Sequence, residues 1–279
     1  MKSATQLKAQ IRNLSKEKNI NPQILLRNYM LERLLERIAH SRFKDNIILK
    51  GGLLVASMVG VELRATVDMD TTIKGLVLDK TRITEIFQEV ILIDTSDHVV
   101  MVLKGIEEIR EESDYPGFRV SLEASMGTAK IPLKVDITAG DCITPKEIVY
   151  PYKLMIENRT IEVLAYNLET VLAEKLETVI TRGVSNTRMR DFYDLYVLLS
   201  LFSDRVSHAL LSEAVKMTSQ RRGTSEELKK ASIVFDQIEN DKDIVQLWTR
   251  YQNSFNYAKD IEWVIIIPAI RQLWEALDI

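Results

Sequence analysis

The sequence predicts an α+β protein in which a mixed sheet with flanking helices is followed by a helical C-terminal half. Apolar residues recur at three- and four-residue spacing before residue 40, alternate with polar residues in the middle third, and return to helical spacing from residue 167. The composition, 46% apolar and 28% charged over 279 residues, is typical of a globular protein. We expect a sheet domain over 1–165 and a helical domain over 166–279.

The first forty residues are expected to form helices. Asn21 is a candidate N-cap, and Pro22 suits the first helical position, because the N–H that proline lacks has no intrahelical partner there. The apolar residues between Ile24 and Ile38 form a stripe that faces a core.

A strand, a glycine turn and a helix are expected next. The apolar run 47–49 ends at Gly51 and Gly52, and the stretch 53–61 lacks proline and can form a helix. Periodicity also predicts the later elements. We expect a helix over 80–91, then strands over 98–109, 118–125 and 131–138, with turns at Pro116-Gly117 and Gly127. The helical half is expected to begin with a helix capped by Asn167, to break at 183–186, and to continue with a helix over 188–201 and further helix up to 263–274.

Composition also excludes several classes of site. The single cysteine, Cys142, cannot form an intrachain disulfide or a thiolate zinc site, and the three histidines are far apart in the sequence. No apolar run approaches the roughly 20 residues that cross a bilayer, and Met1–Arg12 lacks the apolar block of a signal peptide. We therefore expect a cytoplasmic protein without a membrane partner. With a net charge of −3, any nucleic-acid partner must meet a local basic patch.

Two carboxylates share one face of a predicted strand. Residues 67–73 alternate apolar and polar side chains, so Asp68 and Asp70 point the same way. Asp136 lies on a later predicted strand, where alternation puts Lys134 on its face. Carboxylate oxygens suit Mg²⁺, and clustered carboxylates can hold the cations that activate an attacking hydroxyl and steady a leaving pyrophosphate. We expect Mg²⁺ as the cofactor, held by Asp68, Asp70 and Asp136.

The Gly51-Gly52 turn opens a helix, so its backbone N–H groups could approach phosphate oxygens, with the helix dipole adding attraction. Each motif alone has a plain alternative: a solvated strand edge for Asp-x-Asp, an ordinary turn for Gly-Gly, surface polarity for Asp136. Their joint order, strand, Gly-Gly, helix, Asp-x-Asp strand and later Asp strand, favours a phosphate and magnesium site.

This order resembles the polymerase-beta-like nucleotidyltransferase fold, and its particular form resembles the AbiEii/AbiGii toxin family of type IV toxin–antitoxin systems. A second block carries the resemblance further: Ala173-Glu174-Lys175-Leu176, then Arg188-Met189-Arg190-Asp191-Phe192-Tyr193-Asp194-Leu195. The resemblance covers residues from about 47 to 199.

In that family a Lys on one helix and an Arg-Asp-x-x-Asp on the next complete the active cleft. The resemblance therefore implies catalytic roles for Lys175, Asp191 and Asp194 and a nucleotide contact for Arg190. A Lys beside an apolar helix face can reach a phosphate, and aspartates three apart share a helix face. A structural ion-pair network that joins the two helices is the alternative.

The resemblance also draws attention to Lys50, which could meet a triphosphate, and to Thr66, which could bond phosphate or carry a regulatory modification. Both residues could equally be ordinary strand positions. Leu53 departs from the family pattern, which often has a small or hydroxyl residue there, so only a backbone phosphate contact is expected from the turn.

For an acceptor, basic residues at 182, 188, 190, 221–222 and 229–230 are candidates for nucleic-acid contacts. Phe192, Tyr193 and Tyr196 could stack a base, although at helical spacing Phe192 and Tyr196 suit a core.

We expect an enzyme that transfers a nucleotide from an NTP to an acceptor hydroxyl, with Asp136 assisting the attack. The resemblance implies tRNA as the acceptor, growth arrest as the outcome and a cognate antitoxin as the partner. Two alternatives stay open: a transferase that modifies a small molecule such as an antibiotic, and a non-catalytic nucleotide-binding or interaction module.

Overall fold

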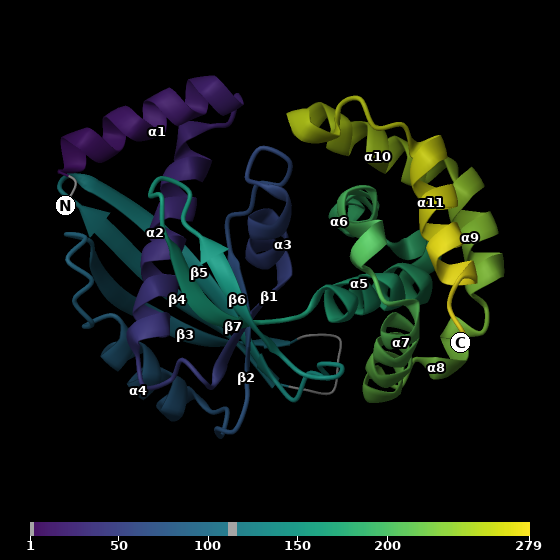
Figure 1. Ribbon diagram of the computed structural model, residues 1–279, viewed down its shortest axis with the longest axis horizontal. Coiled ribbons are helices and arrows are strands. Elements are labelled where there is room, and N and C mark those ends of the chain that lie inside the picture. Colours follow the sequence, from purple (N-terminus) through teal and green to yellow (C-terminus); the bar gives the residue numbers. More distant parts are fainter. Residues whose placement is uncertain (1–2, 111–115) are drawn as a thin grey trace. The chain divides into compact units, whose positions relative to one another are not determined.

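Two helices open the chain in the computed structural model, which describes residues 3–110 and 116–279 (Figure 1). They are α1 (Ala4–Lys18) and α2 (Pro22–His40). The predicted cap of α2 is confirmed, because the Asn21 side chain accepts the N–H of Gln23 at 2.8 Å and Pro22 occupies the first turn.

The strand, glycine and helix order is also confirmed, with different bounds. The elements are β1 (Ile47–Lys50), α3 (Gly51–Val59) and β2 (Met69–Ile73). The helix already begins at the first glycine, and Gly60 at φ +99° ends it. The predicted strand 67–73 was too long at its start, because β1 turns into α3 after Lys50 and offers no further residue to pair before Asp70. Asp68 therefore lies in a bend directly before β2.

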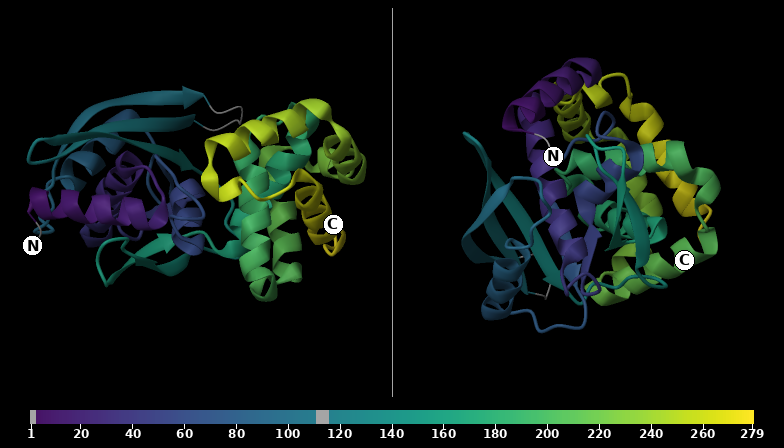
Figure 2. Two further views of the ribbon diagram at one scale, coloured as in Figure 1. Left: turned by 90° about the horizontal axis from the view of Figure 1, so that it is seen from above. Right: turned by 60° about the vertical axis from the view of Figure 1, so that its left-hand side comes forward.

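A seven-stranded mixed sheet follows the order β3-β4-β5-β2-β1-β7-β6. Its further strands, with the helix before them, are α4 (Lys80–Val90), β3 (Val100–Arg110), β4 (Pro116–Met126), β5 (Ala129–Ala139), β6 (Ile148–Lys153) and β7 (Thr160–Ala165). Strand β4 is antiparallel to its neighbours β3 and β5, whereas β2 runs parallel to β5 and β1 parallel to β7. The long strands form a curved layer (Figure 2).

One expectation about the sheet was wrong, and two strands were not predicted. Pro116 and Gly117 do not form a turn but begin β4, where a proline that lacks an N–H is tolerated at the first strand residue. Strands β6 and β7 were not expected, because the edge strand β6 exposes apolar side chains such as Val149 and lacks a clean alternation.

The second half of the chain is helical, as predicted, and is coloured green to yellow in Figure 1. Asn167 caps its first helix by accepting the Thr170 N–H at 2.8 Å. The elements are α5 (Leu168–Arg182), η1 (Gly183–Ser185), α6 (Met189–Phe202), η2 (Ser203–Arg205), α7 (His208–Arg222), α8 (Ser225–Leu228), α9 (Ala231–Asn240), α10 (Lys242–Ser254), η3 (Asn256–Ala258) and α11 (Trp263–Glu275).

The chain divides into two units, each with its own core. The first comprises Met1–Gly140 and Ile148–Ala165 and contains the sheet; the second comprises Asp141–Glu147 and Tyr166–Ile279. In the first unit, α2 packs on β5 and β7, and α3 packs on β1 and β2. In the second unit, α5 packs on α6, α7 and α8 around buried Leu, Val and Phe side chains. None of the helices described is both long and apolar enough to span a membrane.

Candidate active site

The register between β2 and β5 places two predicted carboxylates side by side. Asp70 and Asp136 are direct partners in this parallel pair, and both are half-buried. Their neighbours Met69 and Val135 are fully buried, so alternation turns both carboxylates to the opposite face of the sheet. Residues 66 positions apart in the sequence thus meet through sheet pairing.

Asp68, in the bend before β2, belongs to the same group. Partial burial raises the pKa of Asp68, and the negative charges of Asp136 and Asp70 raise it further. The nearby Lys134 and Arg119 act in the opposite direction. A carboxylate in this position gains from a cation, because a cation would offset the repulsion among the three negative charges.

The glycine turn holds Asp70 directly. The Gly52 N–H donates to Asp70 Oδ2 at 3.1 Å, so the start of α3 already binds a carboxylate oxygen. Gly51 has φ +64°, and a Cβ there would lie 2.1 Å from the same Asp70 oxygen. Only glycine fits at position 51, because a side chain would be strained and would displace Asp70.

The other predicted phosphate contacts differ in exposure. Lys50 ends β1, is half-buried and pairs in register with Asp70. Thr66 is buried, and its hydroxyl donates to the carbonyl oxygen of Asp68 at 3.3 Å. A Cβ at Gly52 would lie 2.8 Å from the Thr66 hydroxyl oxygen and 3.1 Å from Nη2 of Arg64. Thr66 and Arg64 therefore pack closely against Gly52 of the turn.

Arg119 of β4 was missed by the sequence reasoning. Its Nε and Nη2 donate to the two oxygens of Asp136 at 2.8 and 2.7 Å, and this contact raises the pKa of Arg119. The two residues are partners in the antiparallel β4–β5 register. Alternation around buried Phe118 and Val120 was the available signal, but only the register connects Arg119 with Asp136.

The carboxylates fit a divalent cation in part. Asp68 and Asp70 offer hard oxygen ligands, and the raised pKa of Asp68 reflects the concentrated negative charge. In the part of the chain that the structure describes, however, no group of three or more Asp, Glu, His or Cys side chains is arranged to hold a metal. Asp136 does not fit while Arg119 binds both of its oxygens.

A second cluster lies within the helical unit. Lys175 Nζ of α5 donates to Asp191 Oδ1 at 3.0 Å and to Asp194 Oδ2 at 2.7 Å, both on α6. Asp194 is inaccessible to solvent, whereas 17% of the Asp191 side chain and 13% of the Lys175 side chain are exposed. Asp194 thus fixes the Lys175 ammonium group from the buried side, whereas the charges of Lys175 and Asp191 are partly accessible to solvent.

The other candidate nucleic-acid contacts differ in their burial and in their ion-pair partners. Phe192 and Tyr193 are buried in the core, so the hypothesis that they stack a base was wrong. Arg222 pairs with Glu174 and Glu177, and Lys229 pairs with Glu226. Arg190, at the start of α6, is half-buried, and its guanidinium lies 6.0 Å from the centre of the Phe255 ring.

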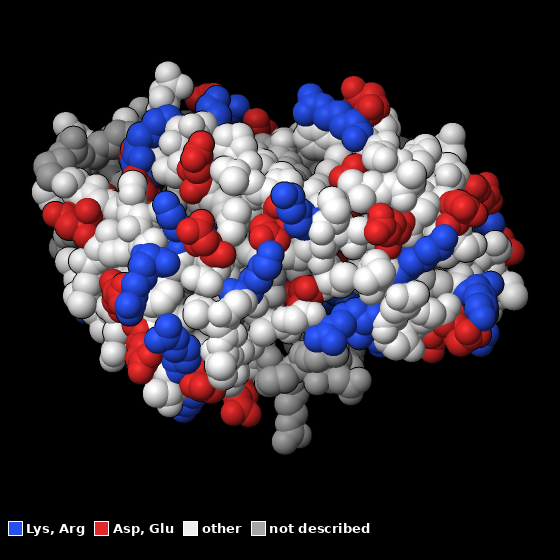
Figure 3. All heavy atoms as spheres, turned by 60° about the horizontal axis from the view of Figure 1, so that its bottom comes forward, with Lys and Arg blue, Asp and Glu red and all other residues white. Residues whose placement is uncertain are grey.

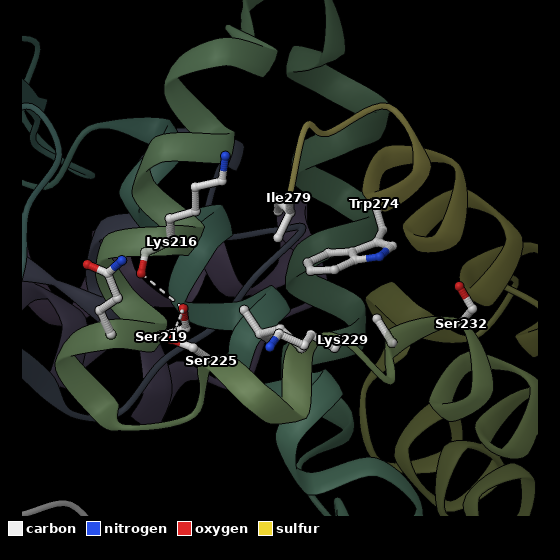
Figure 4. A pocket seen from close by; sticks show the side chains of 10 residues that line it. Lys216, Ser219, Ser225, Lys229, Ser232, Trp274 and Ile279 are labelled. Carbon is white, nitrogen blue, oxygen red and sulfur yellow. Dashed lines mark hydrogen bonds between the residues drawn. The ribbon is translucent and has the colours of Figure 1, made fainter.

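A cavity of about 370 Å³ in the helical unit is lined by ten residues, among them Lys216, Lys229 and Trp274 (Figure 4). Ser219 in its wall donates to the carbonyl oxygen of Lys216 and hydrogen-bonds with Ser225. Lys229, a candidate nucleic-acid contact, lines this cavity, but none of the predicted catalytic, metal-binding or nucleotide-binding residues does, so the candidate active-site residues remain the two charged clusters.

A comparison with protein families matches most of the chain. The family described as nucleotidyl transferase AbiEii toxin, type IV toxin–antitoxin system, matches residues 33–276. The chain belongs to this family. It is a toxin-type nucleotidyltransferase, as the sequence resemblance implied, and membership of a type IV system implies an antitoxin partner. No curated protein sequence matches the AbiEii chain.

Solved structures show the same fold. MenT4, a nucleotidyltransferase toxin from Mycobacterium tuberculosis, is similar with a TM-score of 0.51 and 13% identity, over 92% of this chain and 94% of that one. JHP933 from Helicobacter pylori is similar with a TM-score of 0.50 and 15% identity, over 91% and 94%. The expected nucleotidyltransferase fold with flanking helices is thereby confirmed.

Proposed function

We propose that this AbiEii-family protein transfers a nucleotide from an NTP to a hydroxyl of tRNA and thereby arrests growth. In this proposal Asp68 and Asp70 hold Mg²⁺, which neutralises phosphate charge and steadies the leaving pyrophosphate when bound. Lys175 supplies a cation for a nucleotide phosphate, with Asp194 fixing its position and Asp191 completing the charged group.

The observation that carries the proposal is the grouping of Asp68, Asp70 and Asp136 at the paired strands β2 and β5. Two of them are register partners, and the third has a pKa raised by both neighbours. Two like charges beside a carboxylate with only a structural role destabilise the fold. In a site that binds a cation the same charges favour binding, because the cation relieves their repulsion.

Asp136 has a conditional role in this proposal. While Arg119 donates to both of its oxygens, Asp136 is engaged by the guanidinium and not by an attacking hydroxyl. Since 36% of the Arg119 side chain is exposed, the guanidinium can turn toward solvent or toward a substrate phosphate. Release of Arg119 would free Asp136 to assist the attack.

Charge distribution favours recognition of RNA at local sites. Basic and acidic side chains are interspersed on the face drawn in Figure 3, in keeping with the net charge of −3. A polyanion would therefore be bound by particular arginines and lysines and not by a field of one sign.

Incubation of the purified protein with Mg²⁺, each labelled NTP in turn and total tRNA tests the proposal. Asp68→Ala is the inactive variant, and Asp45→Asn is the matched control, because Asp45 is an exposed aspartate of the same unit outside the site. We expect label in tRNA with the wild type and Asp45→Asn, and none with Asp68→Ala.

Absence of transfer to tRNA with every NTP contradicts the proposed acceptor. Transfer to an added hydroxyl-bearing antibiotic in the same assay would instead identify a small-molecule transferase. Growth of cells that express the wild type or Asp68→Ala, with and without the antitoxin encoded beside the gene, tests the proposed growth arrest.

A further inference from the structure

Two aromatic side chains after α10 remain partly exposed. Phe255 and Tyr257 stack on each other with ring centres 5.3 Å apart and an angle of 23° between their planes. Both are half-buried, in contrast to the buried Phe192 and Tyr193 of α6. Planar rings that keep part of their surface in solvent are suited to contact a planar ligand.

Buried rings hold these two side chains in place. Tyr193 of α6 lies 4.8 Å from Tyr257 between ring centres, and Tyr251 of α10 lies 4.6 Å from Phe255. The hydroxyl oxygens of Tyr251 and Tyr257 are 3.0 Å apart and hydrogen-bonded. The pair is therefore fixed before any ligand arrives, which lowers the entropy cost of binding.

An arginine side chain lies close to one of the two rings. The guanidinium of Arg190 lies 6.0 Å from the centre of the Phe255 ring, within the range of a cation–π contact. Arg190 directly precedes Asp191, whose carboxylate accepts from Lys175. The aromatic pair and the charged cluster thus contact adjacent residues at the start of α6.

The surrounding side chains are polar and exposed. Asn253, Asn256 and Lys259 are exposed and lie within two residues of Phe255 or Tyr257 in the sequence. Aromatic faces with an arginine, amide groups and a lysine match the parts of a nucleotide: a base to stack, base edges to hydrogen-bond and a phosphate to neutralise.

We propose that Phe255, Tyr257 and Arg190 form a stacking platform for a nucleobase joined to a phosphate. This inference deepens the proposed function and rests on it, because the platform lies in the same unit as Lys175 and Asp191, to which the proposal assigns roles in transfer. The nucleobase belongs either to the NTP or to a single-stranded end of the RNA acceptor, and the two sources are separated by experiment.

Binding without turnover tests the platform. The full-length protein is titrated, in EDTA, with a short fluorescent single-stranded RNA by anisotropy and with each NTP by calorimetry. Phe255→Leu keeps the apolar bulk but removes the π face, and Phe255→Trp keeps the π face. Since stacking on one aromatic side chain is worth about 1–3 kcal/mol per base, we expect Phe255→Leu to weaken one probe about tenfold and Phe255→Trp to retain it.

Phe202→Leu is the matched control. Phe202 is also half-buried, sits at the other end of α6 and has Arg205 over its ring at 5.3 Å. It lies eleven residues from Asp191 along the helix, so its replacement should leave the binding of both probes unchanged. Weakening by Phe202→Leu equal to that by Phe255→Leu would overturn the proposal.

A loss confined to RNA assigns the platform to the acceptor, and a loss confined to an NTP assigns it to the nucleotide. Unchanged binding of both probes by Phe255→Leu, or no binding by the wild type, overturns the proposal. Should Phe255→Leu fail to fold, photo-cross-linking of the wild type with 4-thiouridine RNA and 4-thio-UTP decides, since label must fall on residues 255–257.

Comparison of this titration with the transfer assay separates this inference from the proposed function. The platform requires that the wild type binds the probe and that Phe255→Leu weakens this binding, whether or not nucleotide transfer to tRNA is observed. A platform that binds in a protein without transfer activity would contradict the proposed function alone.

Discussion

Arg119 and Asp136 form a two-point ion pair across β4 and β5, with N–O distances of 2.8 and 2.7 Å. The pair lies beside the carboxylates of Asp68 and Asp70, where it neutralises one of three negative charges. Arg119 thereby determines how much negative charge this end of the sheet offers to a cation.

Replacement of Arg119 by Gln should therefore strengthen Mg²⁺ binding. The variant frees both oxygens of Asp136, and a partly exposed ion pair is worth about 1 kcal/mol or less, so we expect binding to tighten about fivefold. Calorimetric titration with Mg²⁺ measures this. Arg82→Gln is the control, because Arg82 is similarly exposed and pairs with Glu85 on α4. Weaker Mg²⁺ binding by Arg119→Gln than by Arg82→Gln would refute the role assigned to Arg119.

Gly51→Ala should cost both stability and activity. The new Cβ would lie 2.1 Å from Asp70 Oδ2 at a backbone φ of +64°, so the carboxylate has to move. We expect a loss of about 2 kcal/mol in the free energy of unfolding and at least a tenfold loss of transfer. Urea denaturation and the transfer assay measure the two effects.

Gly105→Ala provides the comparison for this substitution. Gly105 lies in β3, and a Cβ there meets no atom within 4 Å. Its stability should stay within about 1 kcal/mol of the wild type. Equal stability of the two alanine variants would show that Asp70 tolerates a side chain at position 51.

Asp191 and Lys175 should separate catalysis from stability. Lys175→Met removes the ammonium group that donates to the inaccessible Asp194, so we expect a loss of about 3 kcal/mol in the free energy of unfolding. Asp191→Asn keeps a hydrogen-bonding side chain at a partly exposed position and should cost about 1 kcal/mol or less. If Asp191 serves the reaction, Asp191→Asn nevertheless lowers transfer at least about 100-fold.

The structural alternative for this cluster gives a different pattern. If the ion pairs only join α5 and α6, the activity of Asp191→Asn measured well below its melting temperature equals that of the wild type. Thermal unfolding and the tRNA assay on the same preparations distinguish the two roles.

Glu32 of α2 should make stability depend on pH. Burial raises the pKa of Glu32 to about 8, although Oε1 accepts the Met155 N–H at 2.9 Å. Unfolding returns the pKa to its usual value near 4.5, so unfolding releases a proton between these two pH values. Stability therefore falls as pH rises from about 4.5 to about 8, and Glu32→Gln should reduce this fall.

Urea denaturation at pH 5.5 and 8.5 checks this slope for the wild type, Glu32→Gln and Glu85→Gln. Glu85 is the control because 57% of its side chain is exposed on the same unit. A pH dependence of Glu32→Gln as steep as that of Glu85→Gln would show that another group titrates.

The sequence by itself determined the elements with strong local signals. The caps at Asn21 and Asn167, the glycines before α3 and the helical second half follow from propensity and periodicity, which act over a few residues. Asp68 and Asp70 were also predictable as neighbours, because they are two positions apart in the sequence, although Asp68 lies in the bend before β2 and not on the strand.

Only the tertiary structure decided which distant residues meet. The β4–β5 register brings Arg119 to Asp136, and the packing of α6 buries Tyr193 while leaving Phe255 and Tyr257 partly exposed. Neither outcome is encoded by local spacing, because strand register and burial depend on all the elements that pack together. The physical reason is that periodicity determines the direction in which a side chain points, whereas the packing of all the elements determines which residue it contacts.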